Sequence, residues 1–110
     1  MKIKKTNDSC TLTFTADEFR IFKDNCKQTI LNSDMFEYAI KNTPDEMKND
    51  ESFNDMIKHL KEELAFSKEF EEKYNKEFND KLISSDELAK REKHFNEFKE
   101  QTQVNKENAK

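Results

Sequence analysis

The stretch from residue 52 to residue 83 constrains the fold more than any other part of this chain. It contains no glycine and no proline, and apolar residues recur in it every three or four positions. That spacing predicts an α-helix, which at about 1.5 Å per residue would be a rod about 48 Å long. A chain of 110 residues cannot be that wide if it is compact. The other predicted elements must therefore pack along this rod.

The apolar side of the rod changes direction near residue 65. In its first half, three apolar residues lie within about 40° of Phe53 on a helical projection: Ile57, Leu60 and Leu64. Phe66 lies about 220° from Phe53, and the later apolar positions step back by about 40° each, through Phe70, Tyr74, Phe78 and Leu82. In one interpretation the rod packs against two neighbours: the N-terminal unit covers its first half, and the last helix covers its second half. The other is a partly exposed aromatic surface, and the two are compatible.

The residues around Phe66 form the candidate binding surface, which we call the acidic stripe. An aromatic ring surrounded by carboxylates is typical of a protein-binding hot spot. Residues 34–80 carry seven basic and fourteen acidic side chains, a net charge of −7, whereas residues 1–33 and 81–110 carry +2 and +1. Such a field favours basic protein surfaces and opposes binding to phosphate backbones. The residues of the acidic stripe are Asp55, His59, Glu62, Phe66, Glu69, Phe70, Lys73, Glu77 and Asp80.

The first 50 residues predict a β-hairpin, a helix and short helical segments. Cys10, Leu12 and Phe14 alternate with threonines, so we expect one face of the hairpin to be buried on a helix. Thr15 and Glu18 have the spacing of a capping box, which predicts a helix over residues 16–31. Its apolar stripe consists of Phe19, Phe22, Cys26 and Ile30. Shorter helices are predicted at residues 35–41 and after Pro44, and Asp50 or Ser52 caps the rod.

The predicted fold class is mainly α, within an α+β arrangement. Ser85 is expected to cap a helix over residues 86–102, which returns antiparallel to the rod as a helical hairpin. We expect one domain over residues 1–101, with the ββα unit and short helices in 1–50 and the helical hairpin in 51–101. Residues 102–110 are expected to fray. Because only 33% of the residues are apolar and 40% are charged, the core must be thin.

No arrangement of residues points to catalysis or to a cofactor. Without glycine, the chain lacks the dinucleotide fingerprint, the phosphate loop, the nucleophile elbow and the EF-hand loop. Cys10, Cys26, His59 and His94 are too widely spaced for a zinc clip. Both thiols are expected to be buried, which argues against a cysteine nucleophile, and we expect no disulfide between them. The paired carboxylates lie on solvated helix faces. We therefore expect no enzyme, no cofactor and no metal.

These observations favour a non-enzymatic module that docks its long acidic helix onto a larger protein with a basic surface. The specific hypothesis is a small inhibitor of a nucleic-acid-processing protein, or of its nucleic-acid complex, like those that phages and mobile elements encode against CRISPR nucleases. One alternative is a self-associating homodimeric structural or adaptor protein with its seam on the rod. Another alternative is a DNA-binding regulator with a recognition helix over residues 35–41. This helix would carry the acidic Glu37 and a single basic residue, Lys41, and the chain has a pI of 5.3, all of which argues against DNA binding.

The compartment expected from the sequence is the cytoplasm, that of the host cell if a phage encodes the chain. No apolar run is long enough for a transmembrane span or a signal-peptide core. We therefore expect no membrane partner. The negative charge of the rod leads us to expect no direct contact with nucleic acid.

Overall fold

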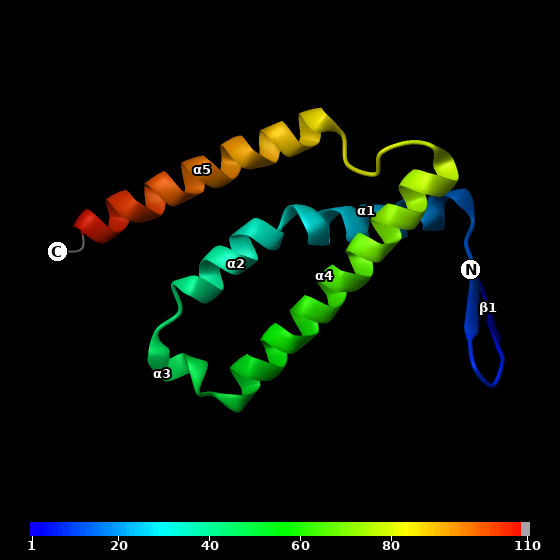
Figure 1. Cartoon of the computed structure of the whole chain (residues 1–110), viewed down its shortest axis with the longest axis horizontal. Helices are drawn as coiled ribbons and strands as arrows, with labels where there is room; N and C mark the ends of the chain where they lie inside the picture. The colour runs from blue at the N-terminus through cyan, green and yellow to red at the C-terminus, as the bar shows by residue number, and fades with distance from the viewer. Residues whose placement is uncertain (109–110) are drawn as a thin grey trace.

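The computed structural model describes the backbone of residues 1–108 and the side chains of residues 1–102. It confirms the predicted fold class, with an N-terminal antiparallel hairpin followed by helices, one of them long and one at the C-terminal end (Figure 1). The strands are β1 (Lys2–Lys5) and β2 (Cys10–Thr13). The helices are α1 (Ala16–Leu31), α2 (Ser33–Lys41), α3 (Asp45–Lys48), α4 (Glu51–Phe78) and α5 (Ser85–Asn108).

The long helix α4 is unbroken through the sixties, but it is shorter than predicted. The Asp50 side chain caps its start by accepting a hydrogen bond from the Ser52 amide at 2.9 Å. The helix ends at Phe78 because Asn79 adopts a left-handed conformation with φ 48°, which asparagine tolerates better than most residues other than glycine. The expectation that the rod reaches residue 83 was wrong. Leu82 therefore lies in a loop, where its amide donates to Asn75 Oδ1 at 2.7 Å.

Helix α1 covers the second half of α4 and runs antiparallel to it. The predicted capping box is confirmed, since the Glu18 amide donates to Thr15 Oγ1 at 3.3 Å and the Thr15 amide donates to Glu18 Oε1 at 3.0 Å. The Phe19 ring lies 6.0 Å from Phe78 and 6.2 Å from Phe70, between ring centroids. We had expected the last helix to cover this half, and that was wrong, because the rings of α1 match the aromatic positions of α4 and α5 offers fewer anchors.

Helix α5 runs back in the direction opposite to α4 (Figure 1). Contacts with α1 and α2 hold it in place. Lys27 Nζ lies 3.1 Å from Glu87 Oε2. Arg91 Nε donates to the Leu31 carbonyl at 2.8 Å, which satisfies a carbonyl in the last turn of α1. The Tyr38 ring of α2 meets two rings of α5, those of Phe95 and Phe98, each at 5.9 Å between centroids.

The bounds of α5 differ from those predicted. Ser84, and not Ser85, caps the first turn, since its Oγ accepts a hydrogen bond from the Glu87 amide at 3.1 Å. The helix continues to Asn108, beyond the expected end at Thr102. The predicted fraying concerns residues 102–110, of which 109–110 lie outside the described residues.

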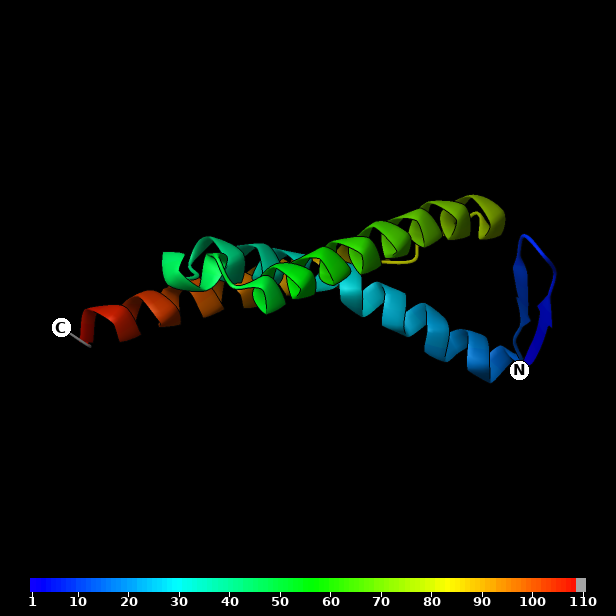
Figure 2. The same cartoon turned by 90° about the horizontal axis from the view of Figure 1, so that it is seen from below.

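The hairpin β1–β2 stands away from the helices at one end of the molecule (Figures 1 and 2). Every residue of both strands is exposed, so the expectation of one buried face was wrong. Cys10 is likewise exposed. The contacts that we find with the helices are at the base of the hairpin, where the Phe14 ring stacks on Phe22 of α1 at 5.4 Å between centroids and the Met1 ammonium lies 2.8 Å from Glu18 Oε1.

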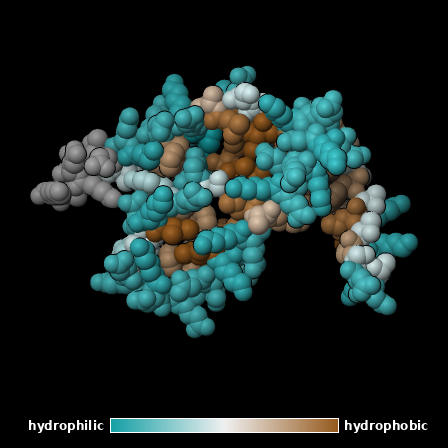
Figure 3. Space-filling view, viewed as in Figure 1, coloured by the Kyte–Doolittle hydropathy of each residue, from teal (hydrophilic) through white to brown (hydrophobic). Residues whose placement is uncertain are grey.

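The core is thin. Among the described side chains, the buried ones are Cys26, Ser67, Leu82 and Ile83. The radius of gyration is 18.0 Å, whereas a compact domain of this length would have about 13 Å. Apolar side chains therefore reach the surface, as the brown areas between α2 and α4 and beneath the start of α5 show (Figure 3).

Candidate functional site

The structure places eight of the nine residues of the acidic stripe on α4. All of these eight side chains are exposed except Phe70, which is half-buried. Asp80 lies outside the helix, in the loop that follows Asn79. At 100° per residue, the eight helical positions fall within about 100° of one another on α4. The predicted surface is therefore continuous along this helix, and Asp80 extends beyond its end.

The two aromatic rings of the acidic stripe have different surroundings. Phe70 packs against α1, with its ring centroid 5.0 Å from that of Phe22 and 6.2 Å from that of Phe19. Phe66 meets Phe22 edge to face at 6.3 Å, and 57% of its surface is exposed. Phe66 is therefore the ring of the stripe that a partner would cover.

Two close pairs of side chains lie within the acidic stripe, and one of them is an ion pair that weakens its negative field. Lys73 Nζ lies 2.9 Å from Glu69 Oε1, and this hydrogen bond raises the pKa of Lys73. His59 Nδ1 lies 3.8 Å from Glu62 Oε2. Exposed pairs of this kind contribute little to stability, because water and salt screen them. The Lys73 ammonium nevertheless offsets part of the charge of Glu69, so the stripe is less acidic than its five carboxylates alone indicate.

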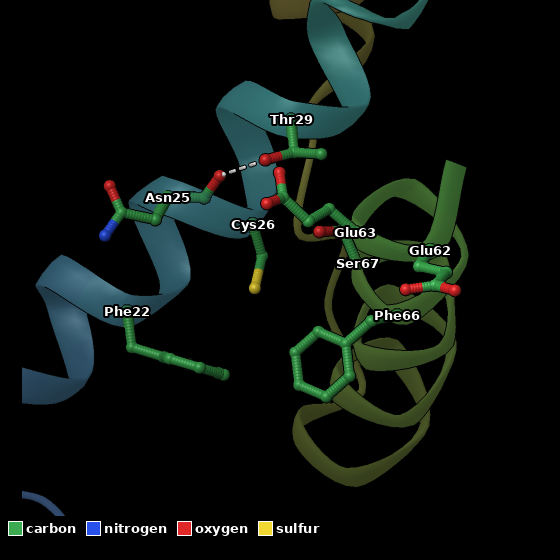
Figure 4. A pocket seen from close by; sticks show the side chains of 8 residues that line it. All are labelled: Phe22, Asn25, Cys26, Thr29, Glu62, Glu63, Phe66 and Ser67. Carbon is green, nitrogen blue, oxygen red and sulfur yellow. Dashed lines mark hydrogen bonds between the residues drawn. The ribbon is translucent and has the colours of Figure 1, made fainter. Parts of the chain in front are cut away.

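An apolar groove of about 440 Å³ lies beside the acidic stripe, between α1 and α4 (Figure 4). The rings of Phe22 and Phe66 face one another across it, and the Cys26 thiol points into it. Glu62 and Glu63 add carboxylates from α4. The residues that line this groove are Phe22, Asn25, Cys26, Thr29, Glu62, Glu63, Phe66 and Ser67. The combination of aromatic walls and carboxylates suits a segment that carries both apolar and basic side chains.

Sequence reasoning missed the α1 side of this groove. Phe22 and Cys26 were recognised as an apolar stripe, but Asn25 and Thr29 were not considered at all. The signal was incomplete, because helical spacing shows which face of α1 is apolar without showing which half of α4 it meets. The antiparallel pairing brings Cys26 beside Ser67 and so creates the groove.

The two cysteines are free thiols in different environments. Cys26 is 6% exposed, and burial raises the pKa of its thiol, while a hydrogen bond with Ser67 acts in the opposite direction. A buried, protonated thiol is a poor nucleophile. Cys10 is exposed on the hairpin, so the expectation that both thiols are buried was wrong for this residue. Its exposure follows from the position of the hairpin, which no helix covers.

Within the described residues, we find no group of three histidine, cysteine, aspartate or glutamate side chains arranged to hold a metal ion. Among the helices of residues 1–108, none combines the length and the hydropathy needed to cross a bilayer. Comparisons with family models, with curated proteins and with solved structures find no match for this chain. The function of this chain must therefore be inferred from its own geometry and charge.

Proposed function

We propose that this chain is a non-enzymatic module that binds a larger protein with a basic surface through the acidic stripe of α4. The single observation that carries the proposal is Phe66, which is 57% exposed on an unbroken helix and lies between Glu62 and Glu69. An aromatic ring of this size is a typical centre of a protein interface, and the surrounding carboxylates would attract basic side chains. The adjoining groove between α1 and α4 adds apolar area to the same surface.

The more specific version is an inhibitor of a nucleic-acid-processing protein. Proteins of that class present basic channels, and a small acidic module could occupy part of one. The small size of the chain, its charge of −4 and its elongated shape support this version. Anti-CRISPR inhibitors of phages and mobile elements are the class that we propose.

The general proposal is tested by affinity capture with the wild-type chain and with the combined variant Glu62→Lys, Glu69→Lys and Glu77→Lys. The matched control combines Glu92→Lys, Glu97→Lys and Glu100→Lys on α5, where the same change of net charge falls on exposed positions. Proteins bound through the acidic stripe should be lost with the first variant and retained with the control. Equal retention by both variants would show that the stripe is not the contact.

The specific version is tested by titrating the wild-type chain into a guide-loaded CRISPR nuclease, with inhibition of DNA cleavage as the readout. We expect cleavage to fall as the chain is added and Phe66→Ser to weaken this inhibition more than Phe98→Ser, a substitution on α5. Because interface aromatic residues often contribute about 2 kcal/mol or more, the loss of affinity should be at least tenfold. If the chain did not bind nucleases of this kind, the inhibitor version of the proposal would be wrong. The general proposal, binding to a larger basic protein, would still be tested by the capture experiment.

A further inference from the structure

Every residue of the two strands of the hairpin β1–β2 is exposed, and the hairpin projects from the helices (Figures 1 and 2). Ile3 and Leu12 are paired across its strands and are 67% and 47% exposed. Each strand has four residues, and within the described part of the chain the sheet has only these two strands. A two-stranded hairpin is marginal in water unless a further strand or a helix stabilises it. An additional strand would therefore stabilise this element.

The two edges of the hairpin differ in charge. Three of the four residues of β1 are lysines, at positions 2, 4 and 5, whereas β2 has the sequence Cys-Thr-Leu-Thr and no charge. Lysines along an edge strand oppose the addition of another strand, and an uncharged edge rich in threonine has no such protection. The β2 edge is therefore the one that is open to pairing.

We propose that two copies of this chain associate through β2, in an antiparallel sheet with the order β1-β2-β2-β1. Antiparallel pairing of β2 with itself can place Leu12 on the two-fold axis, opposite the second copy's Leu12. In that register Thr11 of one copy lies opposite Thr13 of the other. The two side chains of every such pair then lie on the same face of the sheet. No charged residue then meets a like charge across the new seam, whereas pairing through β1 would bring lysines together.

The shape of the molecule is compatible with this dimer. The chain passes from β2 into α1 through residues 14–15, so the helices lie beyond one end of the strand, and the hairpin projects from them (Figures 1 and 2). Antiparallel pairing places the two sets of helices at opposite ends of the sheet, where they do not collide. The lysine-rich β1 strands become the outer edges, which stops growth at two copies.

Sedimentation equilibrium of the full chain over a range of concentrations tests the proposal. The wild-type mass should rise from that of the 13.2 kDa monomer towards twice that value. Leu12→Lys places two like charges opposite one another at the seam and should raise the dimer dissociation constant about tenfold. The matched control is Ile3→Lys, which places the same charge on the same face of the hairpin but on β1, and this variant should still dimerise.

Cross-linking tests the register without relying on a disruptive substitution. In a Cys10→Ser background, Leu12→Cys should form an intermolecular disulfide on mild oxidation, because residues directly opposite in an antiparallel pair lie within disulfide range. Ile3→Cys in the same background should not form one. Equal cross-linking of the two variants would overturn the β2 seam.

Two further results would overturn the proposal. One is a wild-type monomer at every concentration. The other is a dimer whose dissociation constant is unchanged by Leu12→Lys. If Phe66→Ser abolished that dimer, its seam would lie on the acidic stripe instead. The proposal does not depend on the partner-binding function, because the hairpin and the stripe are separate surfaces.

Discussion

At the scale of single residues, asparagine performs the structural work that glycine performs in most chains. Asn79 ends α4 in a left-handed conformation, and Asn75 Oδ1 holds the loop by accepting from the Leu82 amide. The sequence predicted the caps that start α1 and α4, because such caps depend on neighbours in the chain, but it did not predict that Asn79 ends α4. It did not predict the exposure of Cys10, because burial depends on which element packs over a strand.

The two thiols should differ in their reactivity. We expect iodoacetamide to modify folded protein once, at exposed Cys10, because Cys26 is buried and protonated. Mass spectrometry with and without urea measures this, and Cys10→Ser should leave the folded protein unmodified. Modification of Cys26 at the same rate in folded and unfolded protein would contradict the buried position.

The raised pKa of Cys26 also has a consequence for stability. Below the ordinary thiol pKa of 9.0 the folded and unfolded states both keep the proton, so the contribution of this group is fully present. Above that pH the unfolded state loses its proton first, and the contribution is lost as the pH rises through the folded pKa. Cys26→Ala should remove this part of the alkaline destabilisation, and urea unfolding as a function of pH measures it.

At the scale of elements, periodicity predicted which elements form but not how they pack. The hairpin, α1, α2 and the long helix were all predicted, because helical and strand periods are visible in one sequence. The pairing of α1 with the second half of α4 was not, since helical spacing shows which face of a helix is apolar without showing which neighbour covers it. The acidic stripe was placed largely on α4 as predicted, whereas the groove beside it required that pairing and could not be predicted.

The docking of α5 should depend strongly on Arg91. Its Nε donates to the Leu31 carbonyl, and its Nη2 lies 3.5 Å from Asp34 Oδ1, within range of an ion pair but without a hydrogen bond there. Loss of a largely buried charged hydrogen bond costs about 2 kcal/mol, so Arg91→Leu should lower the free energy of unfolding by about that amount. Urea denaturation measures this change. The neighbouring exposed Lys90→Leu should have little effect, and an equal loss in both variants would contradict the role of Arg91 as a tether.

At the scale of the whole molecule, the thin core and the elongated shape have the same origin. A chain with 33% apolar residues cannot enclose a large interior, so its helices share narrow contacts and much of their apolar surface stays open. This surface is the physical basis of both proposals, one at the acidic stripe and one at the hairpin.

The shape can be measured directly in solution. Small-angle scattering of the Leu12→Lys variant, at concentrations below its dimer dissociation constant, should give a radius of gyration close to 18 Å. A compact arrangement of the same helices would give about 13 Å. A value near the lower figure would mean that α5 or the hairpin folds back onto the remaining helices.

The contact between α1 and α4 has a consequence for the rate of folding. These two helices are separated by residues 32–50, and much of that segment is itself helical in α2 and α3. The chain between them is therefore shortened by local structure before the Phe19 and Phe22 rings meet their partners, which reduces the entropy lost in closing the loop. Most of the rest of the structure is helical and is therefore made of local contacts, so this acidic, sparsely packed chain should fold fast even though its stability is modest.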